Sequence, residues 1–123
     1  MRLTMYGLLT LMLLVISPVT EAAPKLKILK AEEIRQTLIG NVITDGFHWR
    51  YHLKADGSID AIEMCRSRKG RWNIRGHRLC LVITSGAAPD ECWDVMREGT
   101  KLVLGINGNA MTDIQVEPPK QRN

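Results

Sequence analysis

The sequence predicts a small, mainly β protein: an antiparallel up-and-down barrel of about eight short strands with one short N-terminal helix. Three observations support this fold class. Residues 47–53 alternate apolar and polar side chains, turn signals recur every few residues after them, and a helical period occurs once, before residue 40. Sequential antiparallel strands leave two exposed edges unless the sheet closes, so a barrel is favoured over an open sandwich.

The helix is expected over residues 31–39. Two glutamates lie in its first turn, where negative charge favours the helix dipole, and Gly40 supplies a stop. Ile34 and Leu38 lie one turn apart and form a narrow apolar stripe. We therefore expect a short helix that plugs or flanks one end of the barrel.

The strands are shorter than ten residues and are joined by tight turns. In the clearest one, over residues 47–53, four apolar side chains alternate with His48, Arg50 and His52. The expected strands are residues 41–44, 47–53, 58–65, 71–75, 78–84, 91–97, 101–106 and 110–116, with turns or loops at 55–57, 69–70, 76–77, 85–90, 98–99 and 107–109.

Residues 1–22 have the layout of a secretory signal peptide: Arg2, an apolar run over residues 8–16, and small residues before a cleavage point after Ala22. The run is far shorter than the roughly 20 residues that span a bilayer, so no transmembrane span is expected. We expect a single barrel domain over residues 23–117, a disordered tail over residues 118–123, and a periplasmic or secreted protein.

Length and composition limit the possible functions. A chain of 123 residues with a net charge of +4 has room for one small domain, which excludes a multidomain enzyme and a repeat array. The three cysteines allow one disulfide. Cys80 and Cys92 lie on the two arms of the expected hairpin around residues 85–90 and would face each other, whereas Cys65 is one strand removed. We predict the Cys80–Cys92 bridge and leave Cys65 as a packed free thiol or a redox-active one.

Several glycine, tryptophan and cysteine positions resemble a family of small secreted bacterial proteins of unknown function. The matching residues are Leu29, Ala31 to Ile34, Gly40-Asn41, Asp56-Gly57, Gly70, Trp72, Gly76, Leu79-Cys80 and Cys92-Trp93. The resemblance implies a barrel and secretion, and it supplies no catalytic residues. The Gly-x-Trp at residues 70–72 is also similar to that of lipocalins and avidins, which implies that Trp72 caps or fills the barrel.

The residue types that could bind a metal ion or catalyse a reaction are not spaced in the sequence as either function requires. His48 and His52 lie about 13 Å apart along a strand, too far to share one zinc, and His77 is on another hairpin. No nucleophile elbow, zinc-protease motif or phosphate loop occurs. We therefore predict a non-enzymatic protein with no metal and no cofactor, and keep a redox or metal role for Cys65 or the three histidines as the alternative.

The charge is concentrated in one segment. Residues 66–78 hold six cations and no carboxylate, namely Arg66, Arg68, Lys69, Arg71, Arg75 and Arg78. Such a cluster attracts an anionic partner, unless it pairs with the acidic segment at residues 90–98. Because we expect the protein to be secreted, we expect no nucleic acid among its natural ligands. The partner is unknown, and an anionic envelope component or an acidic protein surface fits the expected compartment.

The expected function is therefore that of a binding module. It would use the basic face, or a shallow apolar mouth near Phe47, Trp49, Tyr51, Trp72 and Trp93. Inhibition of an extracellular enzyme is a specific version of this hypothesis.

Overall fold

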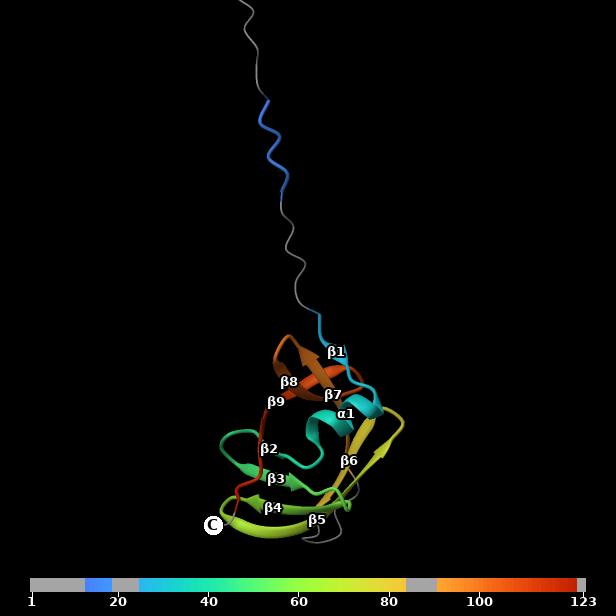
Figure 1. Cartoon of the computed structure of the whole chain (residues 1–123), viewed down its shortest axis with the longest axis vertical. Coiled ribbons are helices and arrows are strands. Elements are labelled where there is room, and N and C mark those ends of the chain that lie inside the picture. Colours follow the sequence, from blue (N-terminus) through green and yellow to red (C-terminus); the bar gives the residue numbers. More distant parts are fainter. Residues whose placement is uncertain (1–12, 19–24, 84–90, 122–123) are drawn as a thin grey trace, which may run out of the picture.

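The computed structural model describes residues 13–18, 25–83 and 91–121, and the last two ranges form the predicted closed antiparallel barrel with one short helix (Figure 1). Its elements are β1 (Lys27–Ile28), α1 (Ala31–Leu38), β2 (Val42–Thr44), β3 (Trp49–Leu53), β4 (Ser58–Glu63), β5 (Arg66–Arg75), β6 (Arg78–Ile83), β7 (Glu91–Glu98), β8 (Lys101–Ile106) and β9 (Asn109–Glu117). Most of the expected signal peptide and the expected loop at 85–90 lie outside the described residues, so signal-peptide cleavage stays a prediction.

The barrel closes because the last strand returns to the first. Each strand from β2 to β8 pairs with the strand that follows it, and β9 pairs back with β2. The two-residue β1 extends the sheet along the second half of β7, where Lys27 lies opposite Arg97. Closure leaves β2 and β9 without a free edge, which is the result predicted for the barrel and not for the sandwich.

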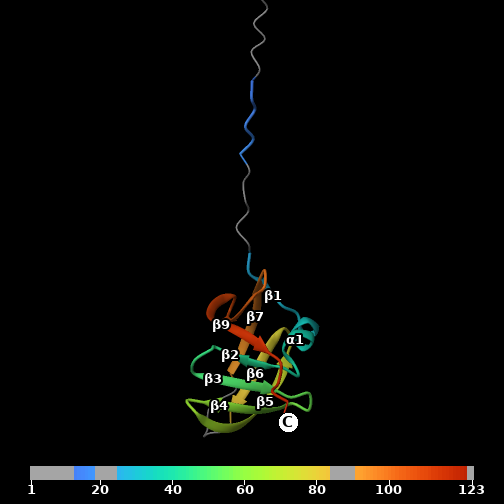
Figure 2. The ribbon, with the colours of Figure 1, turned by 60° about the vertical axis from the view of Figure 1, so that its left-hand side comes forward.

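The helix α1 lies across one end of the barrel (Figures 1 and 2). It begins after Lys30, whose backbone N–H donates to the Glu33 carboxylate, and ends at Leu38, one residue earlier than expected. Ile34 and Leu38 are fully buried and join the core that fills the barrel interior. The apolar stripe read from the sequence is therefore the surface that docks the helix.

The β4–β5 turn is at Met64 and Cys65, and the predicted turn at residues 69–70 is wrong. Both turn residues have positive φ, 48° and 67°, as in the tight hairpin turn whose twist matches the flanking strands. Consequently β5 is one continuous strand of ten residues. Gly70 lies within it, facing the interior beside the buried Ile59, where a Cβ would sit 2.3 Å from the Val82 carbonyl oxygen.

A Gly70→Ala variant is therefore expected to lose about 1–3 kcal/mol of unfolding free energy, because the backbone of β6 would have to move away from β5. Urea denaturation followed by circular dichroism measures this loss. Asn73→Ala, at an exposed position of the same strand, is the control and should unfold near the wild-type midpoint. Equal midpoints for the two variants would show that β5 and β6 are not packed this closely.

The strand predicted from residue 47 begins at Trp49 instead. One oxygen of the Asp45 carboxylate accepts the backbone N–H groups of Phe47, His48 and Trp49, which folds residues 45–48 into a loop. Phe47 is 91% exposed, so it does not belong to the core. The other four aromatic residues of the expected core or mouth are half-buried and pack against the core: Trp49, Tyr51, Trp72 and Trp93.

The predicted disulfide is confirmed. Cys80 on β6 lies directly opposite Cys92 on β7 and is bonded to it. Cys65 is an exposed free thiol in the β4–β5 turn, so it is not packed as one reading of the sequence suggested.

Candidate functional site

The outer face of β2, β3, β4 and β5 carries polar side chains in rows that run across the strands. One row consists of Val42, His52, Asp60 and Lys69, which occupy paired positions on the four strands. The neighbouring row on the same face contains Arg50, Ile62 and Ser67. Because side chains alternate between the two faces of a strand, the residues between these rows point into the barrel.

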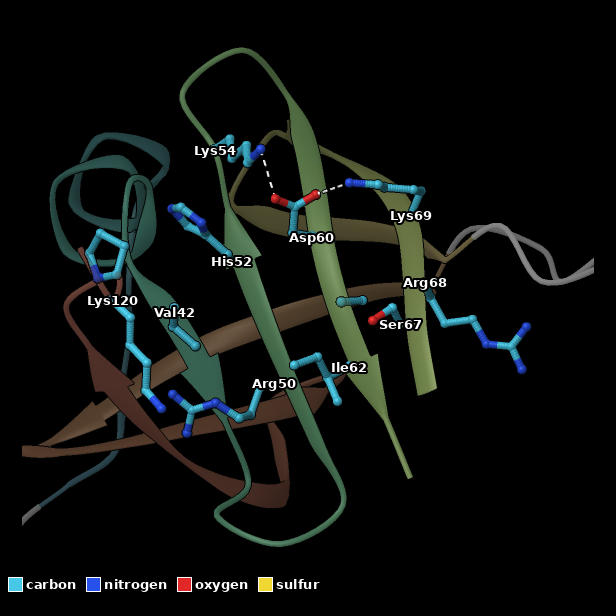
Figure 3. Close-up of a pocket in the computed structure, with 12 residues that line it drawn as sticks. Val42, Arg50, His52, Lys54, Asp60, Ile62, Ser67, Arg68, Lys69 and Lys120 are labelled. Carbon is cyan, nitrogen blue, oxygen red and sulfur yellow. Dashed lines mark hydrogen bonds and ion pairs between the residues drawn. The ribbon is translucent and has the colours of Figure 1, made fainter. Parts of the chain in front are cut away.

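These rows form the floor of a groove of about 650 Å³, which we call the basic groove (Figure 3). Its lining residues are Val42, Arg50, His52, Lys54, Asp60, Ala61, Ile62, Ser67, Arg68, Lys69, Pro119 and Lys120. Five of these residues are cationic, and Asp60 is the one acid among them. The charge of the groove therefore favours an anionic ligand.

At one border of the groove, two lysines hold a single carboxylate. Lys54 Nζ lies 2.7 Å from Asp60 Oδ2, and Lys69 Nζ lies 2.6 Å from Asp60 Oδ1. The hydrogen bonds from Lys54 and Lys69 lower the pKa of Asp60 to about 2. Asp60 therefore remains charged at neutral pH and positions the two ammonium groups. The three side chains together have one net positive charge. We call Lys54, Asp60 and Lys69 the lysine corner.

A second set of charges lies at the opposite border. The Arg50 guanidinium is paired with the Glu117 carboxylate at the end of β9. The chain then continues past β2 and β3, and Pro119 and Lys120 line the groove (Figures 1 and 3). The expected disordered tail is thus described as far as Gln121, and it forms one wall of the groove. We call Arg50, Glu117 and Lys120 the arginine corner.

The six cations predicted to form one basic face are divided between several places. Lys69 and Arg71 lie on the outer face of β5. Arg66 and Arg68 belong to the inner face, where they lie opposite Glu63 and Ala61 in the register of β4 and β5. Arg68 borders the groove, but its side chain points away from the other lining residues in Figure 3. The continuous β5 causes this division, because a strand without a turn at 69–70 alternates faces throughout.

The remaining two predicted cations, Arg75 and Arg78, lie at the β5–β6 turn. Arg78 Nε lies 3.5 Å from the carboxylate of the buried Asp94. The same carboxylate accepts the backbone N–H of Gly108 at 2.8 Å. Pairing with the acidic segment at residues 90–98, the alternative read from the sequence, thus occurs for Arg78, which contributes to structure and not to the groove.

The predicted basic face omitted four basic side chains of the groove: Arg50, His52, Lys54 and Lys120, of which His52 was considered only as a metal ligand. The first two had a signal, because they alternate with apolar residues and so belong to the outer face of their strand. Lys54 continues this alternation just beyond β3 and reaches Asp60 within the β3–β4 hairpin. Lys120 had no signal, since its position follows from the pairing of β9 with β2 and from the path of the tail.

The aromatic residues form a separate feature inside the barrel. The Trp49 and Tyr51 rings stack with centroids 4.6 Å apart, and the Tyr51 hydroxyl donates to Glu63 at 3.1 Å. Burial, followed by the Glu63 carboxylate, raises the pKa of Tyr51, so its hydroxyl stays protonated at neutral pH. The Trp72 indole N–H donates to the Lys54 carbonyl oxygen at 2.7 Å. These contacts give the aromatic residues a packing role.

The three candidate metal-binding histidines have different surroundings. His48 pairs with Asp45 at 2.7 Å, His52 lines the basic groove, and the His77 ring lies 3.4 Å from Asp94. Within the described part of the chain, no group of three or more histidine, cysteine, aspartate or glutamate residues is arranged to hold a metal ion.

Comparison of this chain with protein-family models, with curated proteins and with solved structures found no match. In residues 13–18, 25–83 and 91–121, no helix combines the length and the apolar character that crossing a bilayer requires.

Proposed function

We propose that this protein is a non-enzymatic binding module, secreted or periplasmic, that holds an anionic partner in the basic groove. The observation that carries the proposal is the excess of cations over the carboxylates of Asp60 and Glu117 in one concave surface. Most of the side chains that form it project from a closed sheet, so their backbone positions are fixed before a ligand arrives; Lys54, Pro119 and Lys120 lie just beyond strand ends. A preorganised site costs less conformational entropy on binding than a flexible one does.

The groove is favoured over the barrel interior as the binding surface. Buried aliphatic side chains from every barrel strand except β5, together with Leu29, Ile34 and Leu38, fill the interior. The groove, in contrast, is open to solvent along Lys69, whose side chain is 82% exposed. Charged groups at such a surface act through salt-dependent attraction of a partner of opposite charge.

A binding test compares two variants that each lose two positive charges. Lys69→Ser/Lys120→Ser removes one lysine from each border of the groove, and Lys27→Ser/Lys101→Ser removes two lysines from elsewhere on the barrel. On a heparin column, and by titration with heparin at low salt, the groove variant should bind about tenfold more weakly than wild type, since two exposed ion pairs contribute about 1.4 kcal/mol together.

The control variant should keep most of the wild-type affinity, and raising the salt concentration should weaken both proteins. Equal losses for the two variants would mean that heparin responds to net charge alone, and the proposed function would be wrong. A wild-type protein that does not bind heparin at low salt would also contradict it.

A further inference from the structure

The cations of the basic groove form two separate corners. The lysine corner has two ammonium groups around Asp60, and the arginine corner has Lys120 and the Arg50 guanidinium that is paired with Glu117. Each corner therefore has two cations and one carboxylate, a net charge of one unit. Figure 3 shows Lys54 and Lys69 on one side of the groove, and Arg50 and Lys120 on the other.

The corners are separated across the strands of the sheet. Glu117 on β9 and Asp60 on β4 occupy one cross-strand row with β2 and β3 between them, which corresponds to three strand spacings, or about 14 Å. Between them the floor consists of Val42, His52 and the 46% exposed Ile62. A single small anion would reach one corner only, whereas an extended ligand with anionic groups at intervals would reach both.

We infer that the ligand of the basic groove is a linear acidic oligosaccharide or polysaccharide that lies across β3 and β4 and places one anionic group at each corner. This inference rests on the proposed function and names the class of its ligand. A flexible chain can lie in the hollow and contact the floor, whereas the headgroups of a bilayer form a plane that would contact only the protruding rims. Among the described lining residues, no Trp, Tyr or Phe side chain offers a platform on which a nucleic-acid base would stack.

The two corners predict that affinity depends on ligand length. Once one anionic group is bound, the second corner is reached within the same molecule, at a high effective concentration. A ligand shorter than the span gains nothing from the second corner. Uronic acid oligomers of defined length, such as oligogalacturonates, provide a series in which charge per sugar is constant and only length changes.

The experiment is isothermal titration calorimetry at low salt with the di- and hexasaccharide of this series. The hexasaccharide should bind at least about tenfold more tightly than the disaccharide at equal uronate concentration. Lys120→Ala should abolish most of this difference and leave disaccharide affinity within about twofold of wild type, because the lysine corner still binds one anionic group. Lys101→Ala, which changes a lysine outside the groove, should retain the difference.

The outcomes separate this inference from the proposed function. If the disaccharide binds as tightly as the hexasaccharide at equal uronate concentration while the groove variant still loses heparin affinity, the groove binds anions but does not span two of them, and only the inference fails. If Lys101→Ala removes the length dependence as well, the inference also fails. Tighter, groove-dependent binding to phosphatidylglycerol vesicles or to single-stranded DNA would identify another ligand class. Absence of binding to every probe would overturn both proposals.

Discussion

An Ile34→Ala variant is expected to lose between about 2 and 5 kcal/mol of unfolding free energy, the range for truncation of a fully buried aliphatic side chain. Ile34 has no exposed surface and packs in the core with Leu29 and Leu38. Because α1 closes one end of the barrel, the truncation leaves a cavity where the helix meets the strands. The loss should appear as a lower midpoint in urea denaturation.

Two variants of the same helix test whether docking causes this loss. Arg35→Ala changes an exposed neighbour and should leave the midpoint nearly unchanged, since alanine is at least as good a helix former as arginine. Ile34→Val removes one methyl group and should cost about 0.5–1.5 kcal/mol. A similar midpoint for Ile34→Ala and Arg35→Ala would contradict the docking of α1 against the core.

The barrel, the helix and the disulfide could all be predicted because each depends on a local pattern. Period-two alternation marks strands such as β3, and two apolar residues one turn apart mark the docked face of α1. The Cys80–Cys92 pair follows from its placement on the two arms of one hairpin. In each example, residues that are close together in the sequence are sufficient to predict the contact.

The β4–β5 turn could not be predicted because its residues lack a turn signal. Met64 and Cys65 adopt positive φ, which glycine, asparagine and aspartate adopt more readily. The nearby Gly70 supplied a misleading signal, since its role is to permit close approach of β6. This error changed the predicted basic face, because a strand that continues through residue 70 places Arg68 and Lys69 on opposite faces.

The basic groove depends on contacts between distant parts of the chain. Arg50 and Glu117 are 67 residues apart, and they meet because β9 closes the barrel against β2. The same closure carries Pro119 and Lys120 past β2 to the groove. Sequence patterns report which face a residue occupies, but the pairing of first and last strands decides which residues share a surface.

The residues that stabilise the fold and the residues of the basic groove lie on opposite faces of the sheet. The core consists of inward side chains such as Ile43, Leu53 and Ile59, whereas the groove lysines lie on the outer face and are partly or fully exposed. Exposed ion pairs contribute little to stability, so the groove variants should remain folded. A loss of affinity in those variants can therefore be assigned to the groove.

Removal of the disulfide by the double change Cys80→Ala/Cys92→Ala is expected to lower the unfolding free energy by about 3 kcal/mol. The bridge joins residues separated by 12 positions, and opening a loop of this length returns conformational entropy to the unfolded chain. Thermal denaturation of the oxidised wild type and the double variant measures the loss. Adding a thiol reductant to the wild type should bring its transition close to that of the double variant.

Cys65→Ser provides the matched control because Cys65 is exposed and lies outside the bridge. Its transition should coincide with that of the wild type under oxidising conditions and should fall by the same amount on reduction. The double variant retains Cys65 as its one thiol, so reductant should not change its stability. A Cys65→Ser protein insensitive to reductant would mean that the stabilising bridge involves Cys65, and the pairing of β6 with β7 through Cys80 and Cys92 would then be wrong.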